Sequence, residues 1–336
     1  MIEERLKRIF PLYFGKKIEN LKNKKIFLIG LGALGSNILD LLVRVGVKNI
    51  VLMDRDYVEF SDLLTSPFYT RDDAQVSKPK VIAALERIKS IDKDINAEIF
   101  FENFSPQFVK NFNFYGIDLL IDAVDNLETR FLINEVSLKY KIPWIHGACV
   151  AERGEVSFFK PWEAACYRCL FNKIPERGRL ETCETHGINP SVSKIVAGIE
   201  SDIAIKYLTV NKSFVNKIIY IDYSEGYSLR EFEIKKRKDC PLCIKGIFEF
   251  IDRKEEKIIT FCSEKNVFIK LENFDFEKIK EKWKVLENFS ENIYFIRINP
   301  KGFELKFFKE GKLFIISEEP LEKKKVKTII SRYIGN

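Results

Sequence analysis

The hydrophobic pattern in the first half of the chain alternates between short apolar runs and stretches with helical spacing. Residues 25–29 form an apolar run that ends at a glycine-rich turn, and residues 50–53 form a second run that ends at Asp54. Between them, apolar residues from 36 to 45 recur at the spacing of an amphipathic helix. This order predicts a βαβ unit with parallel strands.

The alternation continues along the chain and predicts one large α/β domain over residues 1–246. A Rossmann-like, doubly wound, mostly parallel sheet with helices on both faces is the architecture that such alternation favours. The further strands are expected at 97–101, 119–122, 144–146 and 156–159, and the further helices at 80–90, 128–140 and 191–208.

The pattern changes after the last cysteine pair, and residues 247–336 are expected to form a small α+β domain. Strands are expected at 258–261, 267–271, 293–298, 303–308 and 312–316, and helices at 274–286 and 321–333. Lys309-Glu-Gly311 separates two apolar runs and predicts a hairpin. The many phenylalanines and lysines here are expected to be exposed and suggest a docking surface for a partner.

Composition and charge narrow the functional class. The chain has 336 residues, 46% of them hydrophobic, which is typical of a folded protein with one or two domains. Its net charge of +7 is small for this length, so we do not expect nucleic-acid binding. Without an uncharged apolar stretch of about 18 residues or an apolar N-terminal leader, we expect a soluble, cytoplasmic protein with no membrane partner.

A glycine-rich loop follows the first predicted strand. In Gly30-x-Gly32-x-x-Gly35 the first glycine permits a tight turn, the second lets a phosphate approach the backbone, and the third allows close packing. Asp54, at the end of the next strand, is placed to accept hydrogen bonds from ribose hydroxyls. The loop predicts nucleotide binding without choosing among NAD, FAD and ATP, and glycines that merely tighten the turn are the alternative.

Four of the seven cysteines form two Cys-x-x-Cys pairs, Cys166 with Cys169 and Cys240 with Cys243. Two such pairs can supply the four thiolates of a tetrahedral Zn²⁺ site. Four protein ligands leave no position for water, so this zinc would be structural. Redox dithiols and unligated thiols are the alternatives.

Taken in series, these motifs identify a resemblance over residues 5–246 to the ThiF/MoeB family of adenylating enzymes, relatives of the ubiquitin-activating enzymes. The motifs in family order are Arg5-x-x-Arg8, the glycine loop, Asp54-x-Asp56, Lys80, Asp125-Asn126 and the two cysteine pairs. The resemblance implies that this domain binds ATP with Mg²⁺, and that the nucleotide-binding positions are Gly30, Gly32, Ala33, Leu34, Gly35, Asp54, Asp56, Lys80, Asp125 and Asn126.

The resemblance also implies individual roles. Lys80 would contact the phosphates, Asp125 would hold Mg²⁺, and Arg8 would reach into the ATP site of the partner subunit in a homodimer. Cys183 matches a cysteine that in relatives forms a thioester or an acyl-persulfide, with a passive cysteine as the alternative. Arg130 follows on the next helix and is structural or contacts the nucleotide.

The implied reaction is adenylation of the C-terminal glycine of a small ubiquitin-like or sulfur-carrier protein ending in Gly-Gly, followed by transfer to a thiol or sulfur donor. Three alternatives stay open: an NAD-dependent oxidoreductase, a non-catalytic dimeric binding protein with this fold, and a relative directed at tRNA.

One departure from the family pattern affects the expected chemistry. Thr65 and Ser66 stand where the family has an arginine that contacts the ATP phosphates and a glutamine. Loss of a preorganised charge lowers rates by about 10²–10³-fold, so efficient adenylation is in question. Arg55, Arg71 and Lys78 are the candidates to replace the missing charge.

Overall fold

The predicted βαβ unit forms the centre of the first sheet. In the computed structural model, which describes residues 4–12, 15–171, 173–175, 186–253, 259–261, 266–271, 273–286 and 288–335, strand β1 (Lys25–Ile29) leads into helix α1 (Ala33–Arg44) and then β2 (Asn49–Asp54). Strand β1 pairs in parallel with β2 on one side and with β4 (Leu119–Asp122) on the other. The carboxyl ends of these strands therefore meet at one edge of the sheet.

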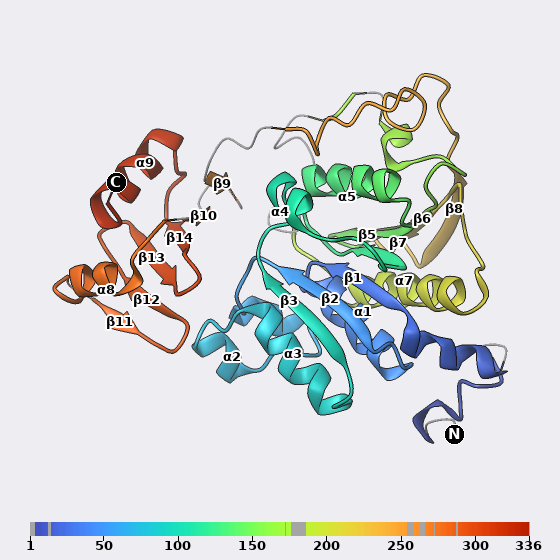
Figure 1. Ribbon diagram of the computed structural model, residues 1–336, viewed down its shortest axis with the longest axis horizontal. Helices are drawn as coiled ribbons and strands as arrows, with labels where there is room; N and C mark the ends of the chain where they lie inside the picture. The colour runs from blue at the N-terminus through green and yellow to red at the C-terminus, as the bar shows by residue number, and fades with distance from the viewer. Residues whose placement is uncertain are drawn as a thin grey trace. The chain divides into compact units, whose positions relative to one another are not determined.

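The described strands of this region form an eight-stranded sheet in the order β3-β2-β1-β4-β5-β6-β7-β8 (Figure 1). The strands from β3 to β5 are parallel, and those from β5 to β8 are antiparallel. The outer strands are β3 (Asn96–Phe101), β5 (Trp144–Val150), β6 (Arg153–Phe159), β7 (Lys217–Asp222) and β8 (Ser228–Glu233). Strands β7 and β8 were not predicted from the hydrophobic pattern.

Helices cover both faces of this sheet, as the doubly wound prediction requires. Alternation along β1 divides its side chains, because Ile26 and Leu28 join one hydrophobic core while Phe27 and Ile29 join the other. The first core includes residues of α1, α3 (Lys80–Ile91) and α7 (Pro190–Val210), and the second includes residues of α4 (Pro106–Asn111) and α5 (Leu127–Tyr140).

Short helices complete this part of the chain. They are η1 (Glu4–Leu6), η2 (Gly15–Asn23), η3 (Phe60–Leu64), α2 (Arg71–Gln75) and η4 (Tyr167–Leu170). Among the helices that the structure describes, none combines the length and the apolar character needed to cross a bilayer.

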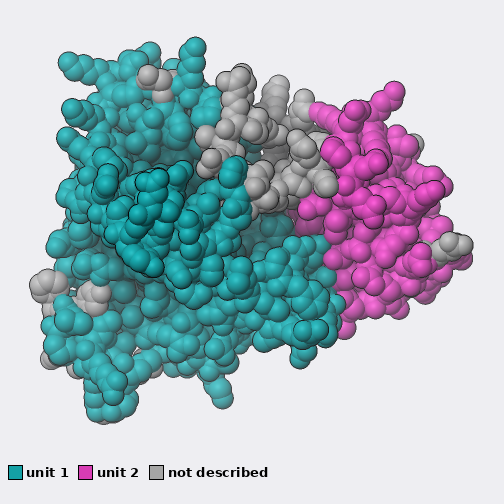
Figure 2. Space-filling view, turned by 180° about the vertical axis from the view of Figure 1, so that it is seen from behind, with its two compact units in different colours: residues 1–253 teal, residues 254–336 magenta. Residues whose placement is uncertain are grey.

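The chain divides into two compact units, residues 1–253 and 254–336, which Figure 2 colours separately. The change in hydrophobic pattern predicted the division after residue 246. Residues 249–251 are held on the first unit because their amides donate hydrogen bonds to the Glu135 carboxylate on α5. That each unit is an independent domain stays a prediction.

The second unit contains an antiparallel sheet whose described strands run in the order β11-β12-β13-β14-β10-β9. Its strands are β9 (Ile259–Phe261), β10 (Asn266–Lys270), β11 (Ser290–Glu291), β12 (Phe295–Ile298), β13 (Phe303–Phe308) and β14 (Lys312–Ser317), and its helices are α8 (Phe276–Lys284) and α9 (Lys323–Tyr333). The predicted hairpin is confirmed, with β13 joined to β14 through Gly311 at φ +79°.

The expectation of exposed phenylalanines in this unit is wrong for most of the hairpin. Phe307, Phe308 and Phe314 are buried, and Phe307 lies in the core with Trp283 of α8. Their burial follows from the strand pattern, because large aromatic side chains on a pleated sheet are stabilised by removal from water.

Candidate functional site

The glycine loop has the three properties that its spacing predicts. Gly30 has φ +95°, and a Cβ there would collide with the carbonyl oxygen of Ala123. A Cβ on Gly35 would collide with the carbonyl oxygen of Gly30, so this glycine permits close packing. Among the described residues, no atom other than those of its chain neighbours lies within 4 Å of the Cβ position at Gly32. The space beside Gly32, at the N-terminus of α1, is therefore open to a phosphate group.

Both sides of the loop are fixed through the backbone of Leu31. Its amide donates a hydrogen bond to Oδ2 of Asp54 at 2.6 Å, and its carbonyl accepts one from the hydroxyl of Tyr69 at 2.6 Å. Oδ1 of Asp54 accepts from the amide of Asp56 at 2.7 Å. Burial and the neighbouring Asp56 raise the pKa of Asp54 to about 6, against the opposing effect of Lys80. Tyr69 was not predicted from the sequence.

Lys80 is brought to the same edge at the first residue of α3. Its Nζ lies 2.9 Å from Oδ1 of Asp62, and its amide donates to the carbonyl of Asp56 at 3.0 Å. Burial would lower the pKa of Lys80, but the carboxylates of Asp62, Asp54 and Asp56 outweigh it and raise the pKa. Lys80, the predicted phosphate ligand, is thus paired with Asp62. No role was predicted for Asp62 from the sequence, although it lies in the segment that departs from the family pattern.

Asp125 and Asn126 follow β4 at the edge where β1 and β2 also end. The exposed carboxylate of Asp125 lies 3.5 Å from the guanidinium of Arg55. Partial enclosure opposes ionisation of Asp125, but Arg55 and Asn126 lower its pKa, so it is a carboxylate at neutral pH. Asn126 is the N-cap of α5, where its Oδ1 accepts from the amide of Thr129 at 2.9 Å.

A buried polar network lies behind Asp125. Asp122 Oδ1 accepts from the amide of Val124 at 3.0 Å, and Arg130 donates to the Val124 carbonyl at 2.7 Å. His146 links Asp122, 2.7 Å from Nδ1, to Glu155, 3.1 Å from Nε2. Burial would lower the pKa of His146, but hydrogen bonds to the two carboxylates raise it. This network fixes the backbone immediately before Asp125.

Thr65 is buried, with 5% of its surface exposed, and its carbonyl accepts from Nδ2 of Asn37 at 2.9 Å. Two of the proposed replacements for an arginine at this position are engaged elsewhere. Arg71 lies over the ring of Phe60, and Lys78 forms ion pairs with Asp73 and Glu86. Of the three candidates, only Arg55 lies beside Asp125.

The N-terminal motif does not lie at this edge in the part of the chain that the structure describes. Arg8 is exposed, and nearby Arg5 pairs with Asp92 at 2.5 Å. Asp92 precedes β3, so it lies at the sheet edge opposite the glycine loop, because β3 runs parallel to β2. Cys183 falls outside the described residues, as does Cys262.

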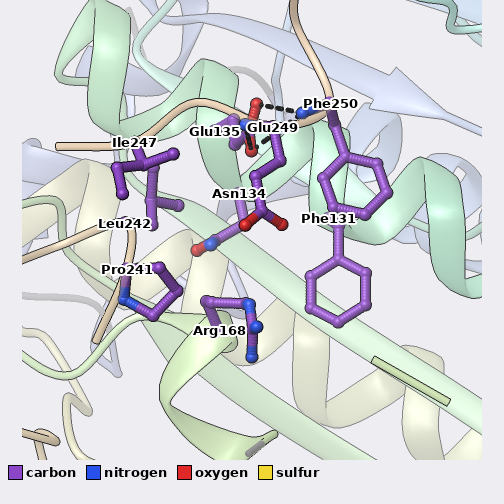
Figure 3. Close-up of a pocket in the computed structure, with 9 residues that line it drawn as sticks. All are labelled: Phe131, Asn134, Glu135, Arg168, Pro241, Leu242, Ile247, Glu249 and Phe250. Carbon is purple, nitrogen blue, oxygen red and sulfur yellow. Dashed lines mark hydrogen bonds between the residues drawn. The ribbon is translucent and has the colours of Figure 1, made fainter. Parts of the chain in front are cut away.

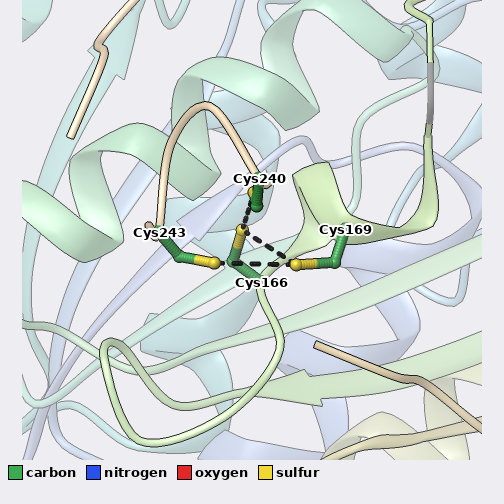
Figure 4. A group of neighbouring side chains, drawn as sticks. All are labelled: Cys166, Cys169, Cys240 and Cys243. Atoms are coloured by element: carbon green, nitrogen blue, oxygen red, sulfur yellow. Dashed lines mark hydrogen bonds between the residues drawn. The ribbon is translucent and has the colours of Figure 1, made fainter. Parts of the chain in front are cut away.

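The two cysteine pairs form one buried cluster, as predicted (Figure 4). The sulfur atom of Cys166 lies 3.9 Å from that of Cys169 and 3.7 Å from that of Cys240, and the sulfur atoms of Cys169 and Cys243 are 3.6 Å apart. All four ligand atoms lie within 4.8 Å of one another.

This geometry fits a tetrahedral ion. Four sulfurs at about 2.3 Å from a central zinc would stand about 3.8 Å apart. The cluster could therefore hold a metal ion.

A small pocket beside this cluster contains the buried carboxylate of Glu135 (Figure 3). Its oxygens accept hydrogen bonds from the amides of Glu249, Phe250 and Ile251 at 2.7–3.0 Å. The pocket is lined by Phe131, Asn134, Glu135, Arg168, Pro241, Leu242, Ile247, Glu249 and Phe250. Since its carboxylate is already satisfied by backbone amides, Glu135 anchors the chain and is not available to a ligand.

Comparison with known proteins gives a consistent set of similarities. A model of the ThiF family matches residues 5–242. A "Sulfur carrier protein ThiS adenylyltransferase" of Bacillus subtilis is 28% identical over 324 residues, which span 94% of each chain. A "SAMP-activating enzyme E1" of Haloferax volcanii is 29% identical over 233 residues, covering 69% of this chain and 84% of the relative.

Among solved structures, Escherichia coli MccB with ATP matches with a TM-score of 0.63 at 18% identity. The match covers 72% of this chain and 75% of MccB. At this level of identity the likeness concerns the fold, and it agrees with the Rossmann-like sheet described above.

Proposed function

Because the chain belongs to the ThiF family, we propose that it is an ATP-dependent adenylyltransferase that activates a small ubiquitin-like or sulfur-carrier protein ending in Gly-Gly. The observation that carries the proposal is the convergence of the open glycine loop, Asp54, Lys80 and Asp125 at one edge of the sheet. The names of the Bacillus and Haloferax relatives support the same substrate class.

The residues at this edge suit an attack on the α-phosphate of ATP. A carboxylate oxygen of the carrier's terminal glycine would attack phosphorus while the bond to the bridging oxygen breaks and pyrophosphate leaves. The amides at the start of α1 would bind phosphate oxygens, and Asp54 would bind the ribose. Lys80 would contact the phosphates, and the carbonyl of Asp56 would hold the Lys80 backbone at this edge. Mg²⁺, when bound, would neutralise charge on the leaving group, and the ionised Asp125 is its proposed ligand.

We assign the four-cysteine cluster to structural Zn²⁺. Four thiolates at these short sulfur–sulfur distances would complete the coordination of a tetrahedral ion and leave no open position for chemistry. The chemistry is therefore assigned to the nucleotide edge. Reduced cysteine ligands also agree with a cytoplasmic location, which we propose on that ground.

ATP–pyrophosphate exchange tests the proposed reaction. Purified protein with Mg²⁺ and candidate carriers ending in Gly-Gly should incorporate labelled pyrophosphate into ATP. Asp125→Ala should lower the exchange rate by about 10²–10³-fold, because one preorganised charge is lost. Asp94→Ala, which removes an aspartate with an 81% exposed side chain, is the matched control. ATP binding without exchange, for every carrier tried, would instead favour a non-catalytic binding protein.

The remaining site assignments have separate tests. Cys183→Ala should leave pyrophosphate exchange intact but remove any covalent carrier adduct if this thiol forms the next intermediate.

Arg8→Ala should lower exchange, and mixing it with an Asp125→Ala variant should restore part of the rate if the two residues act across a homodimer. Deletion of residues 254–336 should weaken carrier binding if that unit docks the partner.

A further inference from the structure

Lys194 lies close to the glycine loop although it comes from a distant part of the chain. It belongs to the first turns of α7, and its Nζ is 3.4 Å from the carbonyl oxygen of Thr65. The same carbonyl accepts from Nδ2 of Asn37, which also donates to the carbonyl of Ala33 at 2.7 Å. Lys194 is therefore connected to Ala33, the first residue of α1, through the Thr65 carbonyl and the side chain of Asn37.

The charges at this edge leave a triphosphate short of cationic partners. The ammonium group of Lys80 is paired with Asp62, and it also experiences the charges of Asp54 and Asp56. The guanidinium of Arg55 lies 3.5 Å from Asp125. Because like charges repel strongly at short range, these carboxylates oppose the binding of phosphate oxygens unless further positive charge is supplied.

Lys194 has the charge and the freedom to supply it. It is exposed, and no carboxylate in the part of the chain that the structure describes lies within ion-pair distance of its Nζ. Its contact with the Thr65 carbonyl is long for a hydrogen bond, so little is lost when the ammonium group moves to another acceptor. A lysine combines a point charge with a flexible four-carbon stem, which suits contact with phosphate.

We propose that Lys194 is a phosphate-binding residue that supplies the positive charge absent at Thr65. It contacts the β- or γ-phosphate of bound ATP. Lys194 belongs to α7 and not to the segment around Thr65. The sequence next to Thr65 therefore gives no sign that a distant lysine replaces the family's arginine. This inference rests on the proposed function, because it requires Mg·ATP at the glycine loop.

Calorimetric titration with Mg·ATP and with AMP tests the proposal. Lys194→Ala should weaken ATP binding by about tenfold, because a charged hydrogen bond to phosphate is lost, and should change AMP binding by less than about twofold. Lys194→Arg should keep most of the ATP affinity. Lys206→Ala removes the same charge from the other end of α7, where Lys206 pairs with Asp202, and should leave both affinities unchanged.

A second variant makes the test independent of any general disturbance of α7. Introducing Thr65→Arg into Lys194→Ala should restore ATP affinity, because the cation returns to the same edge from the other side. If the unaltered protein binds ATP and Lys194→Ala binds it equally well, the inference is wrong while the proposed function stands. Equal weakening of ATP and AMP would also overturn it, as a structural role. Failure of the unaltered protein to bind either nucleotide would overturn both.

Discussion

The cysteine cluster and the nucleotide edge are both built from short sequence motifs, but the structure completes them to different degrees. Four chemically identical side chains on two tight turns come within 4.8 Å of one another. At the nucleotide edge the motif residues also converge, yet Lys80 is paired with Asp62 and Arg55 lies beside Asp125. The cluster has its full ligand set, whereas the edge holds cations already matched by acids.

The two sites differ because different numbers of surrounding residues determine whether each can bind its ligand. A thiolate set depends on its own spacing, since any two Cys-x-x-Cys turns that meet can surround one ion. A phosphate site depends on the balance of every charge nearby, and one acid in an adjacent loop can neutralise the expected ligand. Motif spacing therefore predicts geometry better than it predicts charge.

The largest effect should come from breaking the cluster. Cys240→Ser should abolish stoichiometric zinc binding and lower the melting temperature by about 10 °C or more, because a structural metal contributes several kcal/mol to folding. Metal analysis and thermal unfolding check this. Cys149→Ala, at a buried cysteine outside the cluster, should keep one zinc per chain. A metal-free native protein with unchanged melting would contradict the assignment.

Removal of the acid that pairs with Lys80 should strengthen nucleotide binding. Asp62→Asn removes the carboxylate 2.9 Å from Nζ, so Mg·ATP should bind up to about tenfold more tightly. Titration calorimetry measures the change, and Asp72→Asn on the exposed surface of α2 is the control. Unchanged or weaker binding would mean that the Lys80–Asp62 pair is part of the competent site.

Asp54 should make nucleotide binding depend on pH. Its folded pKa of about 6 means that the carboxylate, the form proposed to accept hydrogen bonds from ribose, becomes dominant as pH rises above about 6. Adenosine has no phosphate group that titrates in this range, so its affinity should rise several-fold between about pH 5 and pH 7, and Asp54→Asn should lack this slope. Because the folded pKa is raised from 3.8, the free energy of unfolding should fall as pH rises from 3.8 to about 6. A pH-independent affinity in the unaltered protein would contradict this role.

The smallest effect is expected from the network behind Asp125. His146→Gln should lower the free energy of unfolding by about 1 kcal/mol, the usual contribution of such hydrogen bonds. Because folding raises the pKa of His146, its contribution to the free energy of unfolding is fully present below the pKa of the unfolded state. That contribution is lost as pH rises through the pKa of the folded state. Denaturant unfolding should therefore show a larger deficit at about pH 6 than at about pH 9, with His186→Gln as the control.

Much of the first unit could be predicted because its signals are local. The strand before Gly30, the helix after it and Asp54 at the next strand end follow from hydrophobic period and glycine spacing. Strand β8 was missed because most of its residues are exposed and polar, and its position depends on pairing with β7. Asp62 and Lys194 were missed because their roles arise from contacts with residues far away in the sequence.

The hydrogen bonds between Glu135 and the amides of residues 249–251 also join two stretches of the first unit that are 114 to 116 residues apart in the sequence. All four cysteines of the cluster lie within the loop that these bonds close. Loss of the carboxylate would leave three amides without their acceptor, and this end of the first unit should then open locally before its core unfolds. A single buried side chain thus acts as a clasp on the chain that follows Cys243.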